Sequence, residues 1–269
     1  MEVSRSNLME RVHTEPVKRV RYRKEDDLWL LPMIKKITPD RPTYGYRWVT
    51  ALLNLGLKNE KNLCVNHKRV HRIMKQNSLL LRWYTRKPSR THDGQVITLR
   101  SNTWWCSDSF VIQCWNEDRV HVVFALDTCD REAIRYLAST LGVDGSMVLD
   151  LLMIESAEDR FGKLNRLPHA NQWLSDNGPC YTAHETVKFG RTLGFEICTT
   201  PSYSPEFNGL AEAFVKSFKW DYVWFGKLTD AKSVMAQLPE WIEDYNERAP
   251  HKGLKMLSPR QFRRQQLTD

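Results

Sequence analysis

Long apolar runs and secretory features are missing from this 269-residue sequence. No stretch reaches the roughly 18 consecutive apolar residues that a membrane-crossing helix needs, and the N-terminus lacks the apolar run of a signal peptide. We therefore expect a cytoplasmic protein without a membrane partner. Apolar residues make up 41% and charged residues 27% of the chain. This composition is that of a folded globular protein, so a disordered class is excluded.

Closely paired cysteines are also missing. None of the six cysteines forms a C-x-x-C pair, and a chain of this size without a secretory signal is not a disulfide framework. We expect reduced, mostly buried thiols. Cys64, His67 and His71 have a loosely zinc-like spacing, but no fourth ligand lies nearby in the sequence. We therefore interpret both histidines as part of a basic helix.

Charge is distributed unevenly between the two parts of the chain. Residues 1–100 hold 22 Lys or Arg against 9 Asp or Glu, whereas residues 101–269 hold 18 against 23. A basic front half favours attraction to a polyanion such as DNA. The alternative is a basic surface that is only solvated.

Helical spacing dominates the front of the chain. Apolar residues recur at helical intervals over 27–37 and 44–55, and we expect Gly56 to end the second helix. Asn66 is a candidate N-cap for a third helix over 67–77. We expect the Pro-Asp-Arg-Pro run that follows Thr38 to break the first helix.

The third predicted helix is apolar on one side and basic on the other. Val70, Ile73 and Met74 form its expected inner face. Three short helices ending in a basic one are typical of a helix-turn-helix unit, whose last helix enters the major groove. The alternative is a small bundle with a solvated face. The candidate DNA-binding residues are Arg47, Lys68, Arg69, Arg72 and Lys75.

After residue 100 the pattern becomes that of strands alternating with helices. Three strands come first and form a meander, which predicts an α/β sheet. The expected elements are strands at 104–113, 119–127 and 132–140, a helix at 145–161, a strand at 172–175, a helix at 182–193, a strand at 195–200, a turn-rich loop at 201–208, helices at 209–225 and 231–246, and a tail at 249–262.

Three acidic residues occupy positions that suit a two-metal phosphoryl-transfer site: Asp108, Asp176 and Glu212. Phosphodiester attack needs several oxygen ligands that converge on Mg²⁺. The helix, strand and loop between Asp176 and Glu212 are long enough to fold the third carboxylate back onto the other two. Asp127 also lies near a strand end, and alternation along the strands leaves both it and Asp108 open as the first acid. Asp127 has Arg131 as a candidate partner.

The order of these elements and acids resembles the ribonuclease H-like core of retroviral integrases and DDE transposases. The finer resemblance is to the second-frame (OrfB) transposases of the insertion sequence 3 family, in particular the insertion sequence 2 subgroup. The matching runs are TYGYRWV (43–49), NHKRVHRIMKQNSLL (66–80), WCSDSF (105–110), FALDTCDREA (124–133), WLSDNGPCY (173–181), SPEFNGLAEAFVKSFKWDYV (204–223) and YNERAPHKGLKMLSPRQF (245–262). Together they cover nearly all of residues 26–264.

The resemblance implies a mixed five-stranded sheet with flanking helices, preceded by a small helix-turn-helix-like domain. It implies that Asp108, Asp176 and Glu212 are the DDE residues and bind two Mg²⁺ ions, with Mn²⁺ as a substitute, and it favours Asp108 over Asp127. Lys219 matches the family's basic residue near the substrate. The domains expected are a basic arm at 1–25, a DNA-binding domain at 26–82, a basic linker at 83–100, a catalytic core at 101–228 and a C-terminal helix and tail at 229–269.

The implied activity is Mg-dependent cleavage and strand transfer of DNA by an insertion element's transposase. The implied partners are the element's terminal repeats, target DNA and further copies of the chain, in a bacterial, nucleoid-associated setting. Family members gain an upstream helix-turn-helix by translational frameshifting, so the upstream-frame product, or a fusion with it, is another expected partner. The alternatives are a non-catalytic DNA-binding regulator and a general nuclease.

Overall fold

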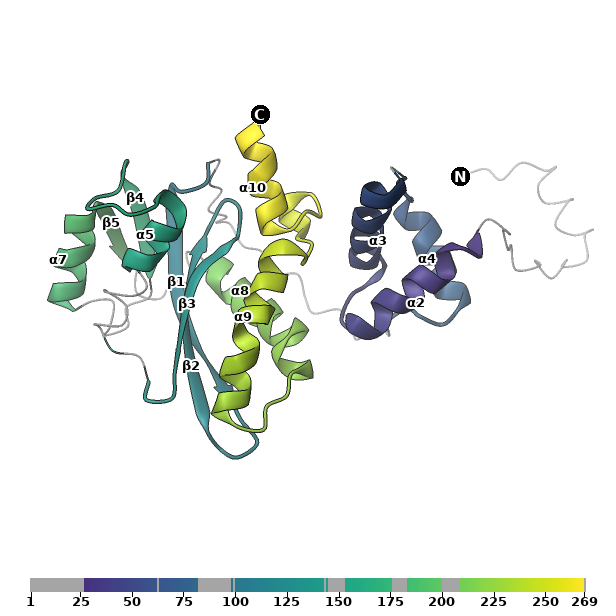
Figure 1. The fold of residues 1–269 in the computed structure, drawn as a ribbon, viewed down its shortest axis with the longest axis horizontal. Helices are drawn as coiled ribbons and strands as arrows, with labels where there is room; N and C mark the ends of the chain where they lie inside the picture. Colours follow the sequence, from purple (N-terminus) through teal and green to yellow (C-terminus); the bar gives the residue numbers. More distant parts are fainter. Residues whose placement is uncertain are drawn as a thin grey trace, which may run out of the picture.

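The computed structural model describes residues 27–61, 63–81, 98, 100–142, 144, 153–175, 183–199 and 209–268. Within these residues a unit of three helices lies beside an α/β core, and the C-terminal helices lie on the side of the core nearer to that unit (Figure 1). The predicted basic arm and the predicted loop at 201–208 lie outside the described residues, as does most of the predicted linker.

The helical unit consists of α2 (Leu30–Asp40), α3 (Tyr46–Lys61) and α4 (His67–Gln76). The side chain of Asn66 accepts a hydrogen bond of 2.8 Å from the backbone N–H of Lys68, which confirms Asn66 as the N-cap of α4. The predicted inner face of α4 is also confirmed. The side chains that form the core of the unit are Leu30, Ile34, Tyr44, Val49, Leu53, Leu57, Val65, Val70, Ile73 and Met74.

Several predicted helix boundaries in this unit are wrong. Helix α3 continues through Gly56 to Lys61, because the next residue, Leu57, is fully buried. Burying a leucine contributes about 1.5–3 kcal/mol, more than the roughly 1 kcal/mol that a helical glycine costs. Helix α2 begins three residues later than predicted and continues to Asp40, so that Pro39 lies in its last turn. The proline costs the helix one N–H hydrogen bond there, and the helix ends one residue after it.

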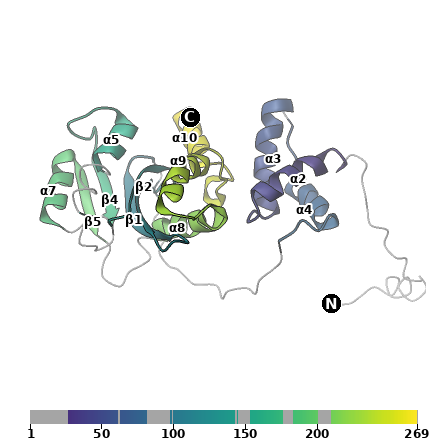
Figure 2. The same ribbon diagram turned by 60° about the horizontal axis from the view of Figure 1, so that its bottom comes forward.

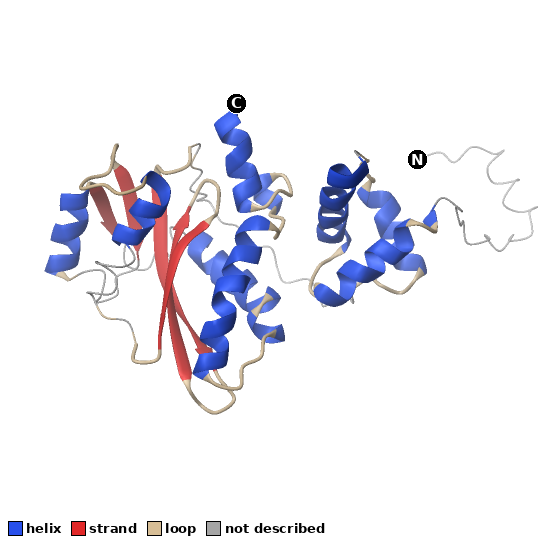
Figure 3. Cartoon of the chain, in the orientation of Figure 1, coloured by secondary structure: helices blue, strands red, loops and turns tan. Residues whose placement is uncertain are grey.

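The core contains one five-stranded sheet in the order β3-β2-β1-β4-β5. Its strands are drawn in red in Figure 3. Strands β1 to β3 form an antiparallel meander, and β4 and β5 are parallel to β1. This arrangement confirms the predicted mixed α/β sheet. The strands are β1 (Trp104–Gln113), β2 (Arg119–Asp127), β3 (Ala133–Ser139), β4 (Asn171–Ser175) and β5 (Phe195–Thr199).

Helices cover both faces of the sheet (Figure 2). Alternate residues of β1 enter two different apolar clusters: Cys106 and Phe110 face one side, and Trp105 faces the other. The first side is covered by α8 (Gly209–Asp221) and α9 (Ala231–Glu247), and the second by α5 (Ile154–Phe161) and α7 (His184–Leu193). The helix predicted at 209–225 ends at Asp221 and is followed by a 3-10 turn, η4 (Val223–Phe225).

The predicted C-terminal tail contains a short turn, η5 (Lys252–Leu254), and a helix, α10 (Pro259–Thr268). Ser258 and Gln261 form a reciprocal capping pair at the start of α10. The Ser258 backbone N–H donates to the Gln261 side chain at 3.2 Å, and the Gln261 N–H donates to the Ser258 hydroxyl at 3.4 Å. This Ser-x-x-Gln signature is a sequence signal for a helix start that our prediction did not use.

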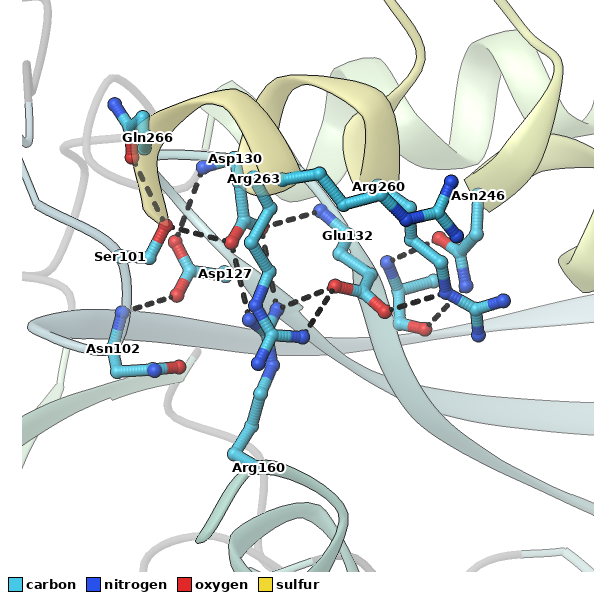
Figure 4. Close-up of polar contacts among 12 residues, drawn as sticks. Ser101, Asn102, Asp127, Asp130, Glu132, Arg160, Asn246, Arg260, Arg263 and Gln266 are labelled. Carbon is cyan, nitrogen blue, oxygen red and sulfur yellow. Dashed lines mark hydrogen bonds and ion pairs between the residues drawn. The ribbon is translucent and has the colours of Figure 1, made fainter. Parts of the chain in front are cut away.

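Ion pairs with the buried Glu132 connect α10 to the turn between β2 and β3 (Figure 4). Arg160, from the end of α5, donates to both carboxylate oxygens of Asp130 at 3.1 and 3.2 Å and lies 3.1 Å from Glu132. From α10, Arg260 and Arg263 donate to the same Glu132 at 2.8 and 3.1 Å. Although burial raises the pKa of Glu132, these three guanidinium groups hold it below its usual range.

The helical unit contacts the core through a second polar cluster. Arg41 forms an ion pair with Asp244 of α9, whose carboxylate also accepts a hydrogen bond of 2.8 Å from the Tyr222 hydroxyl. Thr43 donates to Asp221, at the end of α8, at 2.6 Å. These contacts join segments about 200 residues apart in the chain.

Three of the cysteines that the structure describes are buried, namely Cys106, Cys114 and Cys129, whereas Cys198 is half-buried and Cys64 is exposed. The prediction of mostly buried thiols therefore holds for the core and fails in the helical unit. Among the described residues, no helix combines the length and the apolar character that crossing a membrane requires.

Candidate active site

Asp108 lies near the middle of β1, on the face covered by α8. It shares this face with Cys106 and Phe110, two residues before and after it, which are both buried in the cluster beneath α8 and α9. Its direct partner on β2 is Phe124. The Asp108 side chain is half-buried, and one carboxylate oxygen accepts a hydrogen bond of 2.7 Å from the N–H of Ser109. The sheet therefore holds this carboxylate beside an apolar layer with part of it still accessible.

Strand β4 runs parallel to β1 and brings the second acid's segment close to the first. The paired residues at the end of this ladder are Cys106 and Leu174, and both enter the cluster beneath α8. Asp108 follows Cys106 by two residues, and Asp176 follows Leu174 by two residues. Asp176 lies outside the described residues, which end at Ser175 in this segment.

Glu212 lies in the first turn of α8 and is exposed. The helix is oriented by two buried aromatic contacts: the Phe218 ring lies 5.8 Å from that of Phe110, and the Phe214 ring lies 4.4 Å from that of Phe124. Since Phe124 is the cross-strand partner of Asp108, the N-terminal half of α8 crosses the sheet at the level of that acid. Glu212 precedes Phe214 by two residues.

Lys219 extends from α8 toward β1. Its ammonium nitrogen lies 5.4 Å from the centre of the Phe110 ring, and Phe110 is two residues from Asp108 on the same sheet face. Seven residues complete almost two helical turns, so Lys219 and Glu212 project from the same side of α8. The structure thus brings Asp108, Glu212 and Lys219 to one face of the sheet.

Asp127, the other candidate for the first acid, lies on the opposite face. It is paired with Trp105 across the ladder, and Trp105 belongs to the cluster beneath α5 and α7. Its buried carboxylate accepts hydrogen bonds from the N–H of Asn102 at 2.6 Å and the N–H of Cys129 at 2.8 Å. The predicted pairing with the Arg131 side chain is replaced by a backbone bond from the Arg131 N–H to the Asp127 carbonyl.

Burial of Asp127, together with the nearby charge of Asp130, raises its pKa to about 6, although Arg160 and the two N–H groups act in the opposite direction. A carboxylate enclosed by backbone donors closes a turn. Asp127 therefore has a structural task at the end of β2, and α8 lies on the other side of the sheet from it.

The basic residues predicted on α4 fall into two groups. Lys68 and Lys75 are exposed. Arg69 and Arg72 instead lie 2.7 and 2.6 Å from the carboxylate of Asp27. Burial raises the pKa of Asp27, but these two guanidinium groups outweigh that effect and lower it. No local pattern predicts this pairing, since Asp27 precedes the two arginines by more than 40 residues.

Arg47, at the start of α3, is linked to α4 by contacts of its neighbour Tyr46 with two histidines of that helix. Its Nε donates to the Tyr46 hydroxyl at 3.2 Å, and the Tyr46 ring lies 4.7 Å from that of His71 and 6.2 Å from that of His67. The two histidines thus pack against tyrosine at the base of α4. Arg47 itself is exposed.

Comparisons with known proteins match both parts of the chain. An HTH-like domain model matches residues 24–87, and two integrase core domain models match residues 99–205 and 193–259. Transposase InsD for insertion element IS2D of Escherichia coli K12 is 44% identical over 251 residues, which cover 91% of this chain and 81% of the relative. The same identity and coverage are found for transposase InsD for insertion element IS2H of that organism. The chain belongs to this family of insertion-element transposases.

The comparison with solved structures gives weaker matches. A simian T-cell lymphotropic virus intasome in complex with a PP2A regulatory subunit covers 86% of this chain and 73% of its own, with 16% identity and a TM-score of 0.49. The catalytic domain of the Mos1 mariner transposase covers 53% of this chain and 70% of its own, with 19% identity and a TM-score of 0.43. The integrase core models and the curated relatives identify the chain as a DDE-type enzyme with an integrase core, a member of a metal-dependent family that cleaves DNA and transfers strands.

The donor groups at the candidate site suit a hard divalent cation. Asp108 and Glu212 supply carboxylate oxygens, which Mg²⁺ and Mn²⁺ prefer, and both carboxylates retain exposure to solvent. Within the described ranges, no group of three or more acids, histidines or cysteines converges as a metal site would require. Asp176, the second of the three predicted acids, lies outside those ranges.

Proposed function

We propose that this transposase cleaves and joins DNA at a site formed by Asp108, Asp176 and Glu212, with Lys219 beside them. The observation that supports the site best is the parallel pairing of β1 with β4. The pairing ends at Cys106 and Leu174, beneath the helix that carries Glu212, and in the sequence an acid follows each of these residues by two positions. The opposite orientation of Asp127 supports Asp108 as the first acid.

The three carboxylates would hold two Mg²⁺ ions, with Mn²⁺ as a substitute. Bound ions of this kind supply activation of an oxygen nucleophile and stabilisation of the leaving oxygen. The chain's own residues perform the positioning. The Ser109 N–H orients the Asp108 carboxylate, and the Lys219 ammonium, held above Phe110, contacts a phosphate oxygen of the bound strand.

The proposed reaction consists of two in-line displacements at phosphorus. Water first attacks the phosphodiester at the element's end and releases a 3′-hydroxyl. That hydroxyl then attacks a phosphodiester of the target DNA, and the displaced oxygen leaves as a new 3′-end. Since no side chain acts as the nucleophile, no covalent enzyme–DNA intermediate forms.

Carboxylate replacement tests this assignment. With labelled end DNA and Mg²⁺, we expect Asp108→Asn, Asp176→Asn and Glu212→Gln each to reduce cleavage and joining to background while leaving DNA binding intact. Glu185→Gln, an exposed acid in the first turn of α7, is the matched control and should remain active. Full strand transfer by Asp108→Asn would refute the assignment.

Two rival functions predict different products in the same assay. A non-catalytic regulator binds end DNA but gives no divalent-dependent nicks. A general nuclease gives nicks but no joined ends. Joined ends that depend on Mg²⁺ and on all three acids are the result that we expect from the transposase.

The helical unit, within the proposed domain at 26–82, would contact DNA through α4 and the start of α3. The exposed Lys68, Lys75 and Arg47 support this orientation. Arg69 and Arg72 are held by Asp27 in the structure, and they would contribute to DNA binding only after leaving that carboxylate.

Salt dependence measures these contacts. Each phosphate contact that is lost should reduce the slope of log K against log salt by about 0.9. We therefore expect Lys68→Glu/Lys75→Glu to reduce the slope by about 2, whereas Lys232→Glu, an exposed lysine of α9, should leave it unchanged. An unchanged slope in the double variant would show that α4 does not lie at the phosphates.

Assembly follows from the reaction. Joining two ends requires both to be held together, so we propose self-association on the element's terminal repeats and target DNA, in the bacterial cytoplasm at the nucleoid. The upstream-frame product, or a fusion with it, would complete end recognition. The proposed core at 101–228 and the C-terminal segment at 229–269 act as one body, since Arg260 and Arg263 of α10 bind Glu132. Joined ends from a particle with one protomer, measured by mass photometry, would contradict the assembly.

A further inference from the structure

Helix α8 carries an ordered series of side chains along its exposed side. Glu212, Lys216 and Trp220 are all exposed and recur at intervals of four residues. Positions four apart lie on one helical face, and Lys219 lies beside them. An acid at the start of the helix is therefore followed by two ammonium groups and then by an indole.

A second indole extends this series beyond the end of α8. Trp224, in η4, places its ring 4.3 Å from that of Trp220, with an angle of 47° between the planes. The two side chains are 47% and 63% exposed, respectively. The apolar layer beneath them is formed by other residues, because Phe218, Tyr222 and Val223 are buried. The tryptophan pair is thus not needed to close the core.

We propose that Trp220 and Trp224 form a stacking platform for unpaired nucleotides next to the scissile phosphate. This inference rests on the proposed function, which places that phosphate at Glu212. The eight residues from Glu212 to Trp220 span about 12 Å at 1.5 Å per residue, close to the rise of three to four nucleotides at about 3.4 Å each. A strand leaving the site along α8 would reach the indoles after that number of nucleotides.

Charge complementarity selects a nucleic-acid strand as the occupant. Lys216 and Lys219 lie between the acid and the indoles, where the phosphates of the strand would pass. Indole rings accept the face of any unpaired base, so the platform tolerates different sequences. A base-paired strand presents no free base face, and the proposal is therefore confined to nucleotides that are unpaired at the cut end.

The test measures binding without turnover, with Ca²⁺ in place of Mg²⁺. The probes are a blunt duplex, the same duplex with a short thymidine extension, and the same duplex with an abasic extension of equal length. The variants are Trp220→Ala/Trp224→Ala and the conservative Trp220→Phe/Trp224→Phe. Trp115→Ala serves as the matched control, because Trp115 is 70% exposed but lies at the turn between β1 and β2.

We expect the wild type to bind the thymidine extension about tenfold more tightly than the abasic one, since base–aromatic stacking is of that size. The double alanine variant should lose this preference, the double phenylalanine variant should keep most of it, and Trp115→Ala should keep all of it. Blunt-duplex affinity should stay the same throughout.

Equal wild-type affinity for the thymidine and abasic probes would overturn the platform. An equal loss of affinity for all three probes in the double alanine variant would also overturn it, because that result indicates a change in the fold or in phosphate contacts. A changed sedimentation coefficient of that variant with unchanged DNA binding would overturn it too, because that result indicates a contact between protein chains. Failure of the proposed function would look different. In that case Asp108→Asn would still cleave DNA, which would refute the catalytic assignment, while the preference for the thymidine extension would persist.

Discussion

Replacing Arg160 by methionine should destabilise the transposase more than replacing any surface arginine. The Arg160 side chain is 1% exposed and forms bonds with Asp130 and Glu132, whose side chains are 0% and 7% exposed. Methionine fills part of the same volume but supplies no donor. Two buried carboxylates would then lose a cation, and Asp127 nearby would lose its attraction to that cation.

The expected loss is large because an uncompensated buried charge remains. Removing one partner of a buried ion pair typically costs about 3–5 kcal/mol. For a domain of this size, each kcal/mol shifts the melting temperature by about 2–4 °C, so a decrease of roughly 10 °C is expected. Arg264→Met is the matched control, since Arg264 is 63% exposed and pairs with Glu247 at the surface. Such pairs contribute about 0–1 kcal/mol.

The pH dependence separates a charge effect from a packing effect. Without Arg160, the pKa values of Asp127 and Glu132 should rise above those in the wild type. A carboxyl group with a raised folded pKa stabilises the fold below its unfolded pKa, and that contribution is lost as pH rises through the folded pKa. The deficit of Arg160→Met should therefore be largest near pH 8 and shrink toward pH 5.

Thermal and urea unfolding of both variants, followed by tryptophan fluorescence at several pH values, measures this deficit. Two results would refute the reasoning. One is a deficit for Arg160→Met no larger than that for Arg264→Met. The other is a large deficit that is independent of pH, which would show that packing around the side chain, and not charge, accounts for the stability.

Two further predictions concern stability alone. Gly226→Ala should lower the free energy of unfolding, measured in urea, by about 1–3 kcal/mol, because a Cβ there would lie 2.4 Å from the Trp241 ring. Gly56→Ala should raise that free energy by about 0.5–1 kcal/mol, because a Cβ there has nothing within 4 Å and alanine favours helix α3. Equal effects of the two substitutions would contradict the packing argument. Burial and the Arg131 charge lower the pKa of His251 to about 4. The folded protein therefore favours the neutral imidazole, and its stability should decrease as pH falls from 6.5 toward 4, by at most about 3 kcal/mol. His251→Gln should flatten the decrease of stability over that range, and an unchanged slope would exclude His251 as its source.

The sequence by itself determined most of the helices and strands, with α10 as an exception, and most of what lies on each face. Alternation along β1 separates Cys106 and Asp108 from Trp105, and the spacing of Glu212 and Lys219 places both on one side of a helix. The sequence also predicted Asn66 as the N-cap of α4. Such features depend on neighbours within a few residues, whose relative positions are fixed by strand or helix geometry. The family resemblance added the assignment of Asp108 over Asp127.

Only the tertiary structure decided features that depend on distant segments. Asp27 holds Arg69 and Arg72, and the α10 arginines bind Glu132 more than 120 residues away in the sequence. The continuation of α3 past Gly56 has the same origin, since burial of Leu57 against the other helices outweighs a local propensity. Local sequence sets a preference of about 1 kcal/mol per residue, whereas buried contacts between remote segments are worth several times more. Such contacts cannot be predicted from local sequence, because they form only when the folded chain brings remote segments together.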